Sequence, residues 1–342
     1  MGKAGMNVLQ IVPEMEEGGV ERHVLGLSNS LAAMGNRIVV VSAGGKLEKN
    51  LKDIPCLHLP VHRKNPFTAL YAAFRIADCA KREQIRVLHA HSRVPAWIAW
   101  WASRISGIPF VLTAHAMYSH GRALLPFSRA SAVISVSDAV RRHLAPYLEG
   151  RRSFTILNGL EERAEKWSGR RVGDTVRFLF VGRLANVKGL HVLLGALEKI
   201  RDHPWVLDVV GDGPRRKDLE ALASRLDLGK RVVFHGFRED PETWMTECSC
   251  FLFPSLEEGM GLTLMRAVSM AMPVIASDLP AVREIALSPH GLVPPGQEEA
   301  WAGELRDFLI TGTVRARFVP SRIPGMKEMA SSVAGVYEEV AG

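Results

Sequence analysis

The chain has few cysteines and no long apolar segment. Its 342 residues include four cysteines, at positions 56, 79, 248 and 250, too few and too scattered for a disulfide framework. No second pair completes a zinc ligand set with the last two. No apolar run approaches the ~20 residues that span a bilayer, and the first residues lack the pattern of a signal peptide. We therefore expect a cytoplasmic protein without a structural metal.

Acidic residues are scarce in the first half of the chain. Residues 1–165 contain 21 Lys and Arg against 13 Asp and Glu, whereas residues 166–342 contain 22 against 23. A basic face favours an acidic partner, such as nucleic acid, anionic lipid or a phosphorylated glycan, although a merely solvated face has the same composition. Because regular aromatic stacking positions and known nucleic-acid motifs are missing, we expect no nucleic-acid partner.

Strands and helices alternate in two successive series. A chain of 342 residues, 47% hydrophobic, is too long for one typical core and fits two domains. A short apolar strand, a glycine turn and an amphipathic helix begin near Met6, and the same order begins again near Thr175. This alternation predicts an α/β protein made of two doubly wound, Rossmann-like domains.

The domain limits follow from the same pattern. The polar segment 162–174 breaks the periodicity and predicts a boundary, so we assign residues 1–165 to an N-terminal domain and 166–324 to a C-terminal domain. The last helix, 325–342, has one apolar stripe and is expected to cross back to the first domain. Ligands bind beyond the carboxyl ends of parallel strands, which predicts two domains facing across a cleft where two substrates meet.

Eight short segments carry a family resemblance. In chain order they are GGVERHVLGLSNSLAAMG, TAHA, NGL, VGRLANVKG, VVGDGP, VVFHGF, PSLEEGMGL and GLVPPG. Together they resemble a family 4 glycosyltransferase with the GT-B fold. The segment RVPAWIAWWAS, with SAGGKL before it, further resembles members that build lipopolysaccharide core or other cell-envelope glycans.

The resemblance implies a retaining, hexosyl-type transferase. A nucleotide-sugar, with a UDP-sugar expected, is then the donor co-substrate, no cofactor is needed, and the acceptor is a glycan or glycolipid. The basic N-terminal domain becomes the acceptor side, with peripheral contact to anionic lipid at the inner face of the cytoplasmic membrane. Asp138 is the nearest candidate base for an inverting reaction, but SVSDAV fits a helix cap better. A sugar-nucleotide epimerase of the same fold and a weakly active nucleotide-sugar binding protein remain alternatives.

Two basic side chains follow the first strand of the second series. Arg183 and Lys188 flank the turn after FLFVG. Breaking a sugar–diphosphate bond leaves about one extra negative charge on the leaving group, so fixed cations there stabilise the transition state. No convincing Asp-x-Asp pair stands at a strand end to hold a divalent ion. We therefore expect a metal-independent reaction, although each side chain also fits a surface ion pair.

A carboxylate and a glycine turn precede the helix expected at Leu262. Gly259, Met260 and Gly261 let the first helix amides approach phosphate or sugar oxygens. The Glu258 carboxylate can accept hydrogen bonds from sugar hydroxyls, as the resemblance implies. A helix-start carboxylate without a ligand is the other explanation of Glu258.

Five further positions complete the candidate site. His115 ends the segment PFVLTAHA, where a histidine can donate to a sugar hydroxyl, and the resemblance places a functional histidine there. Gly18 and Gly19 permit close approach of donor phosphate or acceptor to the first turn. The backbone at Phe237 and Arg238 is expected to line the base pocket. A core histidine and an ordinary turn are the alternatives for His115 and for the two glycines.

Arg266 departs from the family pattern. Members commonly place a second glutamate eight residues after the first, and it pairs with the ribose hydroxyls of the nucleotide. Arginine only donates hydrogen bonds and cannot accept these. Either another residue holds the ribose, or Arg266 contacts the diphosphate or an acidic donor, or donor binding is weak. The predicted catalytic set is His115, Arg183, Lys188 and Glu258.

Overall fold

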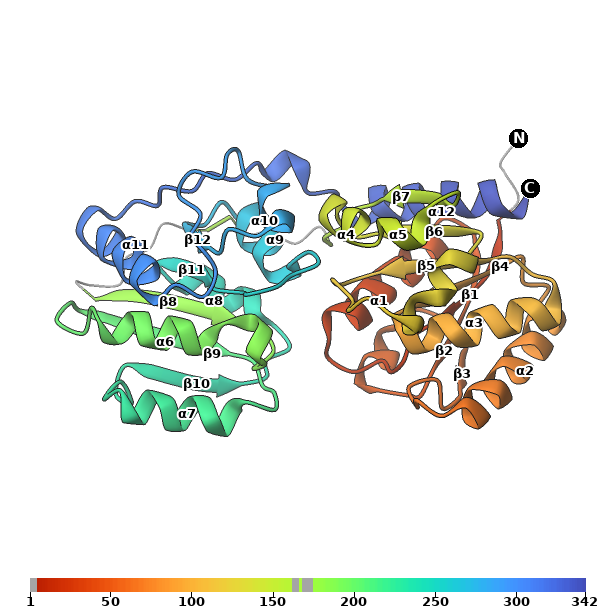
Figure 1. Cartoon of the computed structure of the whole chain (residues 1–342), viewed down its shortest axis with the longest axis horizontal. Coiled ribbons are helices and arrows are strands. Elements are labelled where there is room, and N and C mark those ends of the chain that lie inside the picture. Colours follow the sequence, from red (N-terminus) through yellow and green to blue (C-terminus); the bar gives the residue numbers. More distant parts are fainter. Residues whose placement is uncertain (1–4, 162–165, 168–174) are drawn as a thin grey trace. The chain divides into compact units, whose positions relative to one another are not determined.

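The computed structural model describes residues 5–161, 166–167 and 175–342 (Figure 1). Contacts divide the chain into two compact units. Unit 1 is Met1–Glu162 together with Pro324–Gly342, and unit 2 is Arg163–Ile323. Most of the predicted boundary segment, residues 162–174, lies outside the described residues.

Unit 1 is built on a seven-stranded parallel sheet. The strand order is β3-β2-β1-β4-β5-β6-β7. Most of its strands are short apolar runs buried on both faces, as parallel sheets covered by helices require. The strands are β1 (Asn7–Ile11), β2 (Arg37–Ser42), β3 (Cys56–His58), β4 (Val87–His91), β5 (Phe110–Ala114), β6 (Ala132–Ser135) and β7 (Arg152–Thr155).

Helices cover both faces of this sheet. α1 packs beside α12 on one face, and α2 packs beside α3 on the other (Figure 1). Short 3₁₀ turns lie at Lys46–Asn50 and Arg122–Arg129. The helices are α1 (Gly19–Ala33), α2 (Pro66–Arg82), α3 (Arg93–Ser106), α4 (Asp138–His143), α5 (Ala145–Leu148) and α12 (Met326–Ala341).

The C-terminal helix α12 lies in the core of unit 1. Met329, Val333 and Tyr337 from its apolar stripe are buried there. The Met326 amide donates to the Leu160 carbonyl at 2.9 Å, which pairs the returning chain with the segment after β7. A Cβ on Gly159 would lie 2.7 Å from Met326 Cα, so this approach needs glycine.

Unit 2 has a smaller sheet of five parallel strands in the order β10-β9-β8-β11-β12. Its strands are β8 (Val176–Val181), β9 (Trp205–Val210), β10 (Val232–Gly236), β11 (Cys250–Phe253) and β12 (Val274–Ala276). Its helices are α6 (Leu190–Glu198), α7 (Arg216–Arg225), α8 (Pro241–Glu247), α9 (Leu262–Ser269), α10 (Pro280–Arg283) and α11 (Glu298–Thr311), with 3₁₀ turns at Asn186–Lys188 and Pro320–Arg322.

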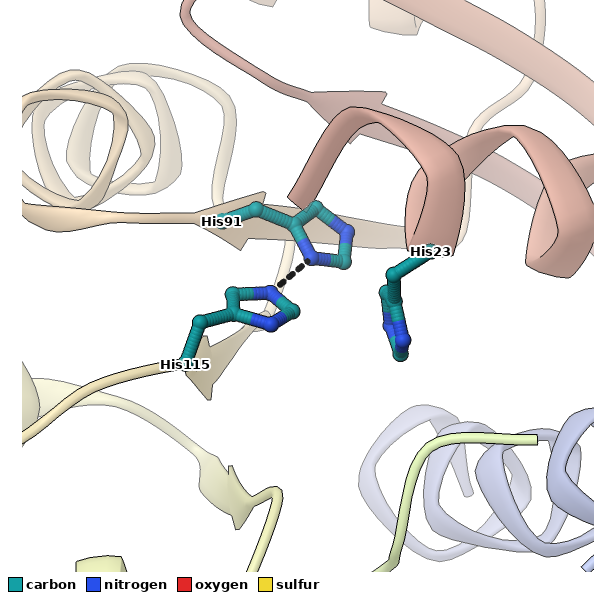
Figure 2. A group of neighbouring side chains, drawn as sticks. All are labelled: His23, His91 and His115. Atoms are coloured by element: carbon teal, nitrogen blue, oxygen red, sulfur yellow. Dashed lines mark hydrogen bonds between the residues drawn. The ribbon is translucent and has the colours of Figure 1, made fainter. Parts of the chain in front are cut away.

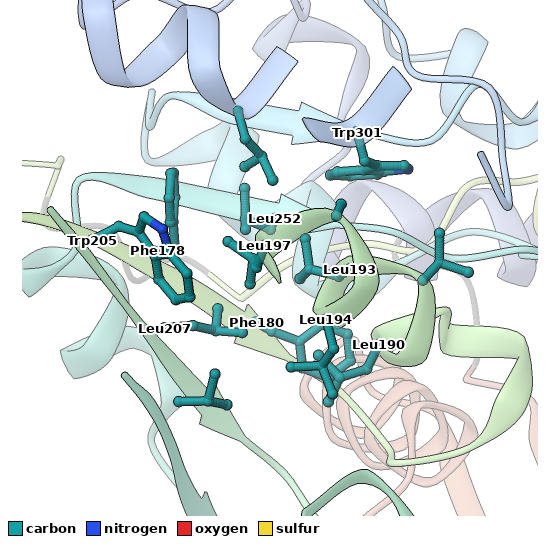
Figure 3. Packing of buried hydrophobic residues seen from close by; sticks show 14 of the residues in the cluster. Phe178, Phe180, Leu190, Leu193, Leu194, Leu197, Trp205, Leu207, Leu252 and Trp301 are labelled. Carbon is teal, nitrogen blue, oxygen red and sulfur yellow. The ribbon is translucent and has the colours of Figure 1, made fainter. Parts of the chain in front are cut away.

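The core of unit 2 packs α6 and α11 against the sheet. Figure 3 shows leucines of α6 between the strand residue Phe180 and Trp301 of α11. Trp205 is 1% exposed, and its indole N–H donates to the Ile200 carbonyl at 2.9 Å. Trp205 is therefore buried with its indole N–H paired, whereas the buried Trp301 indole nitrogen has no hydrogen-bond partner among the described residues.

Strand order reverses once in each sheet. The reversal lies between β1 and β4 in unit 1 and between β8 and β11 in unit 2. The turns that leave two such strands run to opposite faces and open a crevice at the carboxyl ends, where ligands of this architecture bind. Both units are doubly wound α/β domains, which confirms the predicted fold class.

Candidate functional site

The turns after β8 and β11 are joined at the strand-order reversal of unit 2. The Leu256 amide donates to the Val187 carbonyl at 2.8 Å. Gly189 has φ of +67°, and a Cβ there would lie 1.9 Å from the Pro254 carbonyl oxygen. Only glycine permits this contact, so the backbone itself fixes the two predicted donor-site turns against each other.

Lys188 and Glu258 form an ion pair across these turns. Their side chains are 26% and 13% exposed, so the pair is largely removed from water. The Lys188 ammonium also lies 6.0 Å from the centre of the Phe253 ring, at the limit of a cation–π contact. The structure therefore brings together two predicted catalytic residues that are 70 positions apart.

The helix α9 begins directly beside this pair. Gly259 and Met260 are buried, Gly261 is the cap residue, and Leu262 is the first helical residue. The cap supplies no side-chain hydrogen bond to the first amides of the helix. These N–H groups are the donors that a helix N-terminus offers to phosphate or sugar oxygens, close to the Glu258 carboxylate.

Arg183, Phe237 and Arg238 lie at the same edge of the sheet. Arg183 is exposed in the turn after β8, and its guanidinium makes no hydrogen bond or ion pair with the described residues. Phe237 is half-buried and Arg238 is exposed, both in the turn after β10. Because β10 is the outermost strand beside β9, these two residues lie farther from the strand-order reversal than Arg183 does.

Arg266 is paired within unit 2. It lies on α9, and its Nε is 2.8 Å from the Glu242 carboxylate of α8, with which it forms an ion pair. The two side chains are 13% and 29% exposed. Arg266, which stands where family members commonly have a second glutamate, is thus paired with Glu242. The sequence did not predict this partner. The pair joins α9 to the helix that follows Phe237 and Arg238.

Gly18 and Gly19 lie at the strand-order reversal of unit 1. Gly18 is the cap residue of α1 and Gly19 its first residue, in the turn that follows β1. Gly18 caps the helix without a side-chain hydrogen bond, so the first amides of α1 are donors at this edge.

Three histidines meet at the same edge of unit 1 (Figure 2). His23 lies on α1, His91 ends β4, and His115 follows β5. His91 Nδ1 and His115 Nε2 are 3.1 Å apart and hydrogen-bonded. Both ring nitrogens of His89, by contrast, are already bonded, to Tyr337 and Thr113, so His89 is a core residue. His115, the predicted catalytic histidine, therefore belongs to a cluster.

Burial keeps these imidazoles neutral. It lowers the pKa of His23 to about 4 and holds the pKa values of His91 and His115 well below the ordinary value. The neighbouring histidines lower the last two pKa values further, because like charges repel. Near pH 7 each ring therefore carries one N–H donor and one lone pair.

Unit 1 also contains a cavity that sequence reasoning missed. Its volume is about 540 Å³. The loop before α2, the first turns of α2 and α3, and Tyr118 line it with cations and aromatic rings, among them Arg63, Lys64, Arg93, Trp97, Trp101 and Tyr118. The Arg93 guanidinium lies 5.3 Å from the centre of the Tyr118 ring. This lining suits a ligand with negative charge and an apolar or sugar face.

The residue between His91 and Arg93 is strained. Ser92 has φ of +79°, a conformation that L-residues adopt at a cost of about 1–3 kcal/mol. It is also part of the cavity lining. Such strain persists where the surrounding structure imposes it, and here it lies at the carboxyl end of β4.

The exposed face of α2 is apolar. Phe67, Leu70, Tyr71 and Phe74 are 83%, 44%, 50% and 55% exposed. Their spacing of three and four residues places them on one side of the helix, opposite a buried stripe of small residues. The sequence carried this signal, but periodicity alone does not tell which of two apolar stripes faces the core.

Two family models match the chain, one on each unit. "Glycosyltransferase Family 4" matches residues 17–163, and "Glycosyl transferases group 1" matches residues 175–310. The chain belongs to the family 4, group 1 glycosyltransferases. This confirms the predicted family, and together the two models cover most of the glycosyltransferase.

Curated relatives of this glycosyltransferase include enzymes named for lipid substrates. The phosphatidyl-myo-inositol mannosyltransferase of Mycobacterium leprae is 28% identical over 366 residues, covering 95% of this chain and 94% of the relative. The phosphatidylinositol N-acetylglucosaminyltransferase gpi3 subunit of Schizosaccharomyces pombe is 27% identical over 296 residues. That match covers 79% of this chain but only 65% of the yeast protein.

Solved structures share the fold of the glycosyltransferase. Anabaena Alr3699/HepE, crystallised with UDP and glucose, has a TM-score of 0.77 and 22% identity over 98% of this chain and 97% of its own. The lipopolysaccharide outer core galactosyltransferase WaaB has a TM-score of 0.75 and 18% identity over 98% of this chain and 100% of its own. These glycosyltransferases have the GT-B fold, as the sequence predicted for this chain.

Proposed function

We propose that the glycosyltransferase moves a hexosyl group, with retention of configuration, from a UDP-sugar to a cell-envelope glycan or glycolipid. Lipopolysaccharide core is the acceptor type we favour. The observation that carries the proposal is the Lys188–Glu258 ion pair beside the start of α9. It places a cation, a hydrogen-bond acceptor and free helix amides at one point of unit 2.

Unit 2 has the chemistry of a donor site. Arg183 and Lys188 supply fixed positive charge for the diphosphate, and the first amides of α9 supply hydrogen-bond donors. Glu258 accepts hydrogen bonds from sugar hydroxyls. Uridine as the base is supported by the fold relative HepE, which was crystallised with UDP and glucose.

The chemical step needs no cofactor from this chain. The bond between the anomeric carbon and the diphosphate oxygen breaks, and its electron pair leaves with UDP. The acceptor hydroxyl oxygen bonds the same face of that carbon, and its proton passes to the departing diphosphate. Arg183 and Lys188 stabilise the negative charge that develops on the leaving group, a role that a metal ion fills in other enzymes.

A retaining reaction agrees with the state of Asp138. This carboxylate lies in the first turn of α4 and pairs with Arg141 at 2.7 Å and Arg142 at 3.0 Å. The hydrogen bond from Arg141, with the positive charge of both arginines, lowers the pKa of Asp138 below its ordinary value. A carboxylate held ionised by two arginines is a poor general base.

The cavity of unit 1 suits the acceptor. Its cations match phosphate or carboxylate groups of a charged glycan, and Trp97 and Trp101 offer apolar surface to sugar rings or a lipid. His115 lies near this cavity, since its amide donates to the Tyr118 hydroxyl at 3.4 Å. Its outer ring nitrogen, Nδ1, makes no hydrogen bond with the described residues, and we assign it to a sugar hydroxyl.

We further propose that α2 places the protein on an anionic membrane. The apolar face of Phe67, Leu70, Tyr71 and Phe74 is flanked by basic residues of the preceding loop, Arg63 and Lys64. Apolar insertion with adjacent positive charge is the pattern of an interfacial helix. None of the helices in the described part of the chain has the length and apolarity to span a bilayer. The expected location is the cytoplasmic face of the inner membrane.

A thermal-shift screen tests the donor assignment. Nucleoside diphosphates and nucleotide-sugars are added to the full chain, and UDP-sugars are expected to raise Tm most. The best donor is then incubated with and without lipopolysaccharide-core acceptors. Acceptor-dependent release of UDP supports transfer. Conversion of one donor sugar into another without acceptor would instead support the epimerase.

A further inference from the structure

The histidine cluster has the donor set of a transition-metal site. One ring nitrogen from each of His23, His91 and His115 lies within 4.8 Å of the other two. The rings come from three different elements that meet at the carboxyl edge of the sheet (Figure 2). No sequence motif joins positions 23, 91 and 115, so the sequence predicted no metal here.

Of the three histidines, His23 has the poorest hydrogen bonding. Its side chain is buried, the residue being 5% exposed, and both of its ring nitrogens lack a hydrogen-bond partner among the described residues. Asn158 interacts with the imidazole and partly offsets the burial that lowers the pKa of His23. A buried ring that lacks well-formed hydrogen bonds costs about 1–3 kcal/mol, so His23 has a lone pair to offer to an ion.

The other two rings are already oriented for a shared ion. His91 Nε2 donates to Gln10 Oε1 at 3.0 Å, so His91 Nδ1 carries the lone pair that accepts the hydrogen bond from His115 Nε2. An ion between the two rings would replace this proton, which would move to His115 Nδ1. Ligating histidines usually donate their second N–H as His91 does to Gln10. Two nitrogens bound tetrahedrally at 2.0–2.1 Å lie about 3.3 Å apart, and these two are 3.1 Å apart.

We propose that His23, His91 and His115 bind one divalent transition ion of the Zn²⁺ type. The fourth position is left to water or to an anion. Imidazole nitrogens suit zinc, cobalt, nickel or copper and are poor ligands for Mg²⁺ or Ca²⁺, which prefer oxygen.

The ion would fix the His115 ring. Bound through Nε2, His115 must carry its proton on Nδ1, the nitrogen we assign to a sugar hydroxyl. Only this consequence rests on the proposed function. Metal binding itself is independent of it and is measured without substrate.

Zn²⁺ binding is tested by competition with a chromophoric chelator, using the tag-free full chain. Wild type is expected to bind one equivalent. His23→Phe keeps the ring volume and removes a ligand, and should weaken Zn²⁺ binding about 100-fold or more. His290→Ala, which removes an exposed histidine of unit 2, should change nothing. Equal affinity in wild type and a folded His23→Phe would overturn the site.

A second measurement needs no variant. Co²⁺ added to wild type is expected to give the visible absorption bands of a tetrahedral nitrogen site, and one equivalent of Zn²⁺ should remove them. Mg²⁺ should leave the bands in place, since it competes poorly for imidazole. Absence of Co²⁺ bands, or bands that Zn²⁺ does not remove, would contradict the proposal even where His23→Phe fails to fold.

Discussion

The Lys188 ammonium and the Glu258 carboxylate are ion-paired across the turns that follow β8 and β11. Either residue alone fits several roles in the sequence. Placed together at the strand-order reversal of unit 2, they give a cation for a diphosphate next to an acceptor for a sugar. A donor that binds there must exchange part of this pair for contacts of its own.

We expect Lys188 to accelerate the chemical step. Lys188→Ala should lower kcat by about 10²–10³, because it removes charge from the leaving group. The matched control is Lys199→Ala, which removes a lysine that pairs with the exposed Glu299 in the same unit. Steady-state kinetics with the donor found by thermal shift measure both. A kcat for Lys188→Ala equal to that of the control would exclude the role.

Arg266 and Glu242 are expected to stabilise each other. Arg266→Glu brings two carboxylates together in place of an ion pair and should lower Tm, since like charges at this separation repel. The exchange Arg266→Glu with Glu242→Arg should recover most of the loss. Thermal unfolding of the two single variants and the double variant gives the coupling. Additive effects would show that the pair contributes nothing.

Donor binding to the Arg266 variants separates two of the explanations of this residue. If another group holds the ribose, the exchanged pair binds UDP as wild type does. If Arg266 contacts the diphosphate, both variants that lack it lose UDP affinity. Calorimetric titration of UDP into the folded variants decides between these outcomes.

The apolar face of α2 is expected to bind anionic vesicles. Phe67→Ser should weaken binding about tenfold, because the loss of one inserted aromatic ring costs about 1.5 kcal/mol. Ile310→Ser is the control, because Ile310 is an exposed apolar residue of unit 2. Binding is measured by vesicle co-sedimentation at two salt concentrations.

Rising salt should weaken binding of wild type to anionic vesicles. Equal binding of wild type to anionic and neutral vesicles at low salt would exclude the electrostatic part.

We expect Arg93 to bind the acceptor. Arg93→Gln should raise the acceptor KM about tenfold or more, the effect of one charge-assisted hydrogen bond, and leave the donor KM unchanged. Arg104→Gln, at the other end of α3, is the control. A change in the donor KM alone would show that Arg93 acts on the donor and not on the acceptor.

The sequence predicted those parts of the fold that depend on local pattern. Apolar runs such as Val176–Val181 predicted strands, and the turns after them located Arg183, Lys188 and Glu258 at carboxyl ends. The apolar stripe of the last helix predicted that it buries a face, and the structure places it in unit 1. These features follow from a few neighbouring residues.

Contacts between residues that are distant in the chain could not be predicted from the sequence. Glu242 lies 24 positions before Arg266, and nothing in either segment indicates that α8 and α9 meet there. The three histidines converge only because β1, β4 and β5 are neighbours in the sheet. His91 and His115 each mark the end of a strand, and that shared position is the one signal that predicts their proximity.

We propose that Arg183 and Lys188 hold the nucleoside diphosphate in unit 2. The most direct measurement is calorimetric titration of UDP and UMP into wild type and into the variant Arg183→Ala/Lys188→Ala. Wild type should bind UDP about 100-fold more tightly than UMP, as two charge-assisted contacts to the extra phosphate imply, and the variant should lose most of this difference. Equal affinities of wild type for UDP and UMP, or an unchanged preference in the variant, would contradict the assignment of Arg183 and Lys188 to the diphosphate.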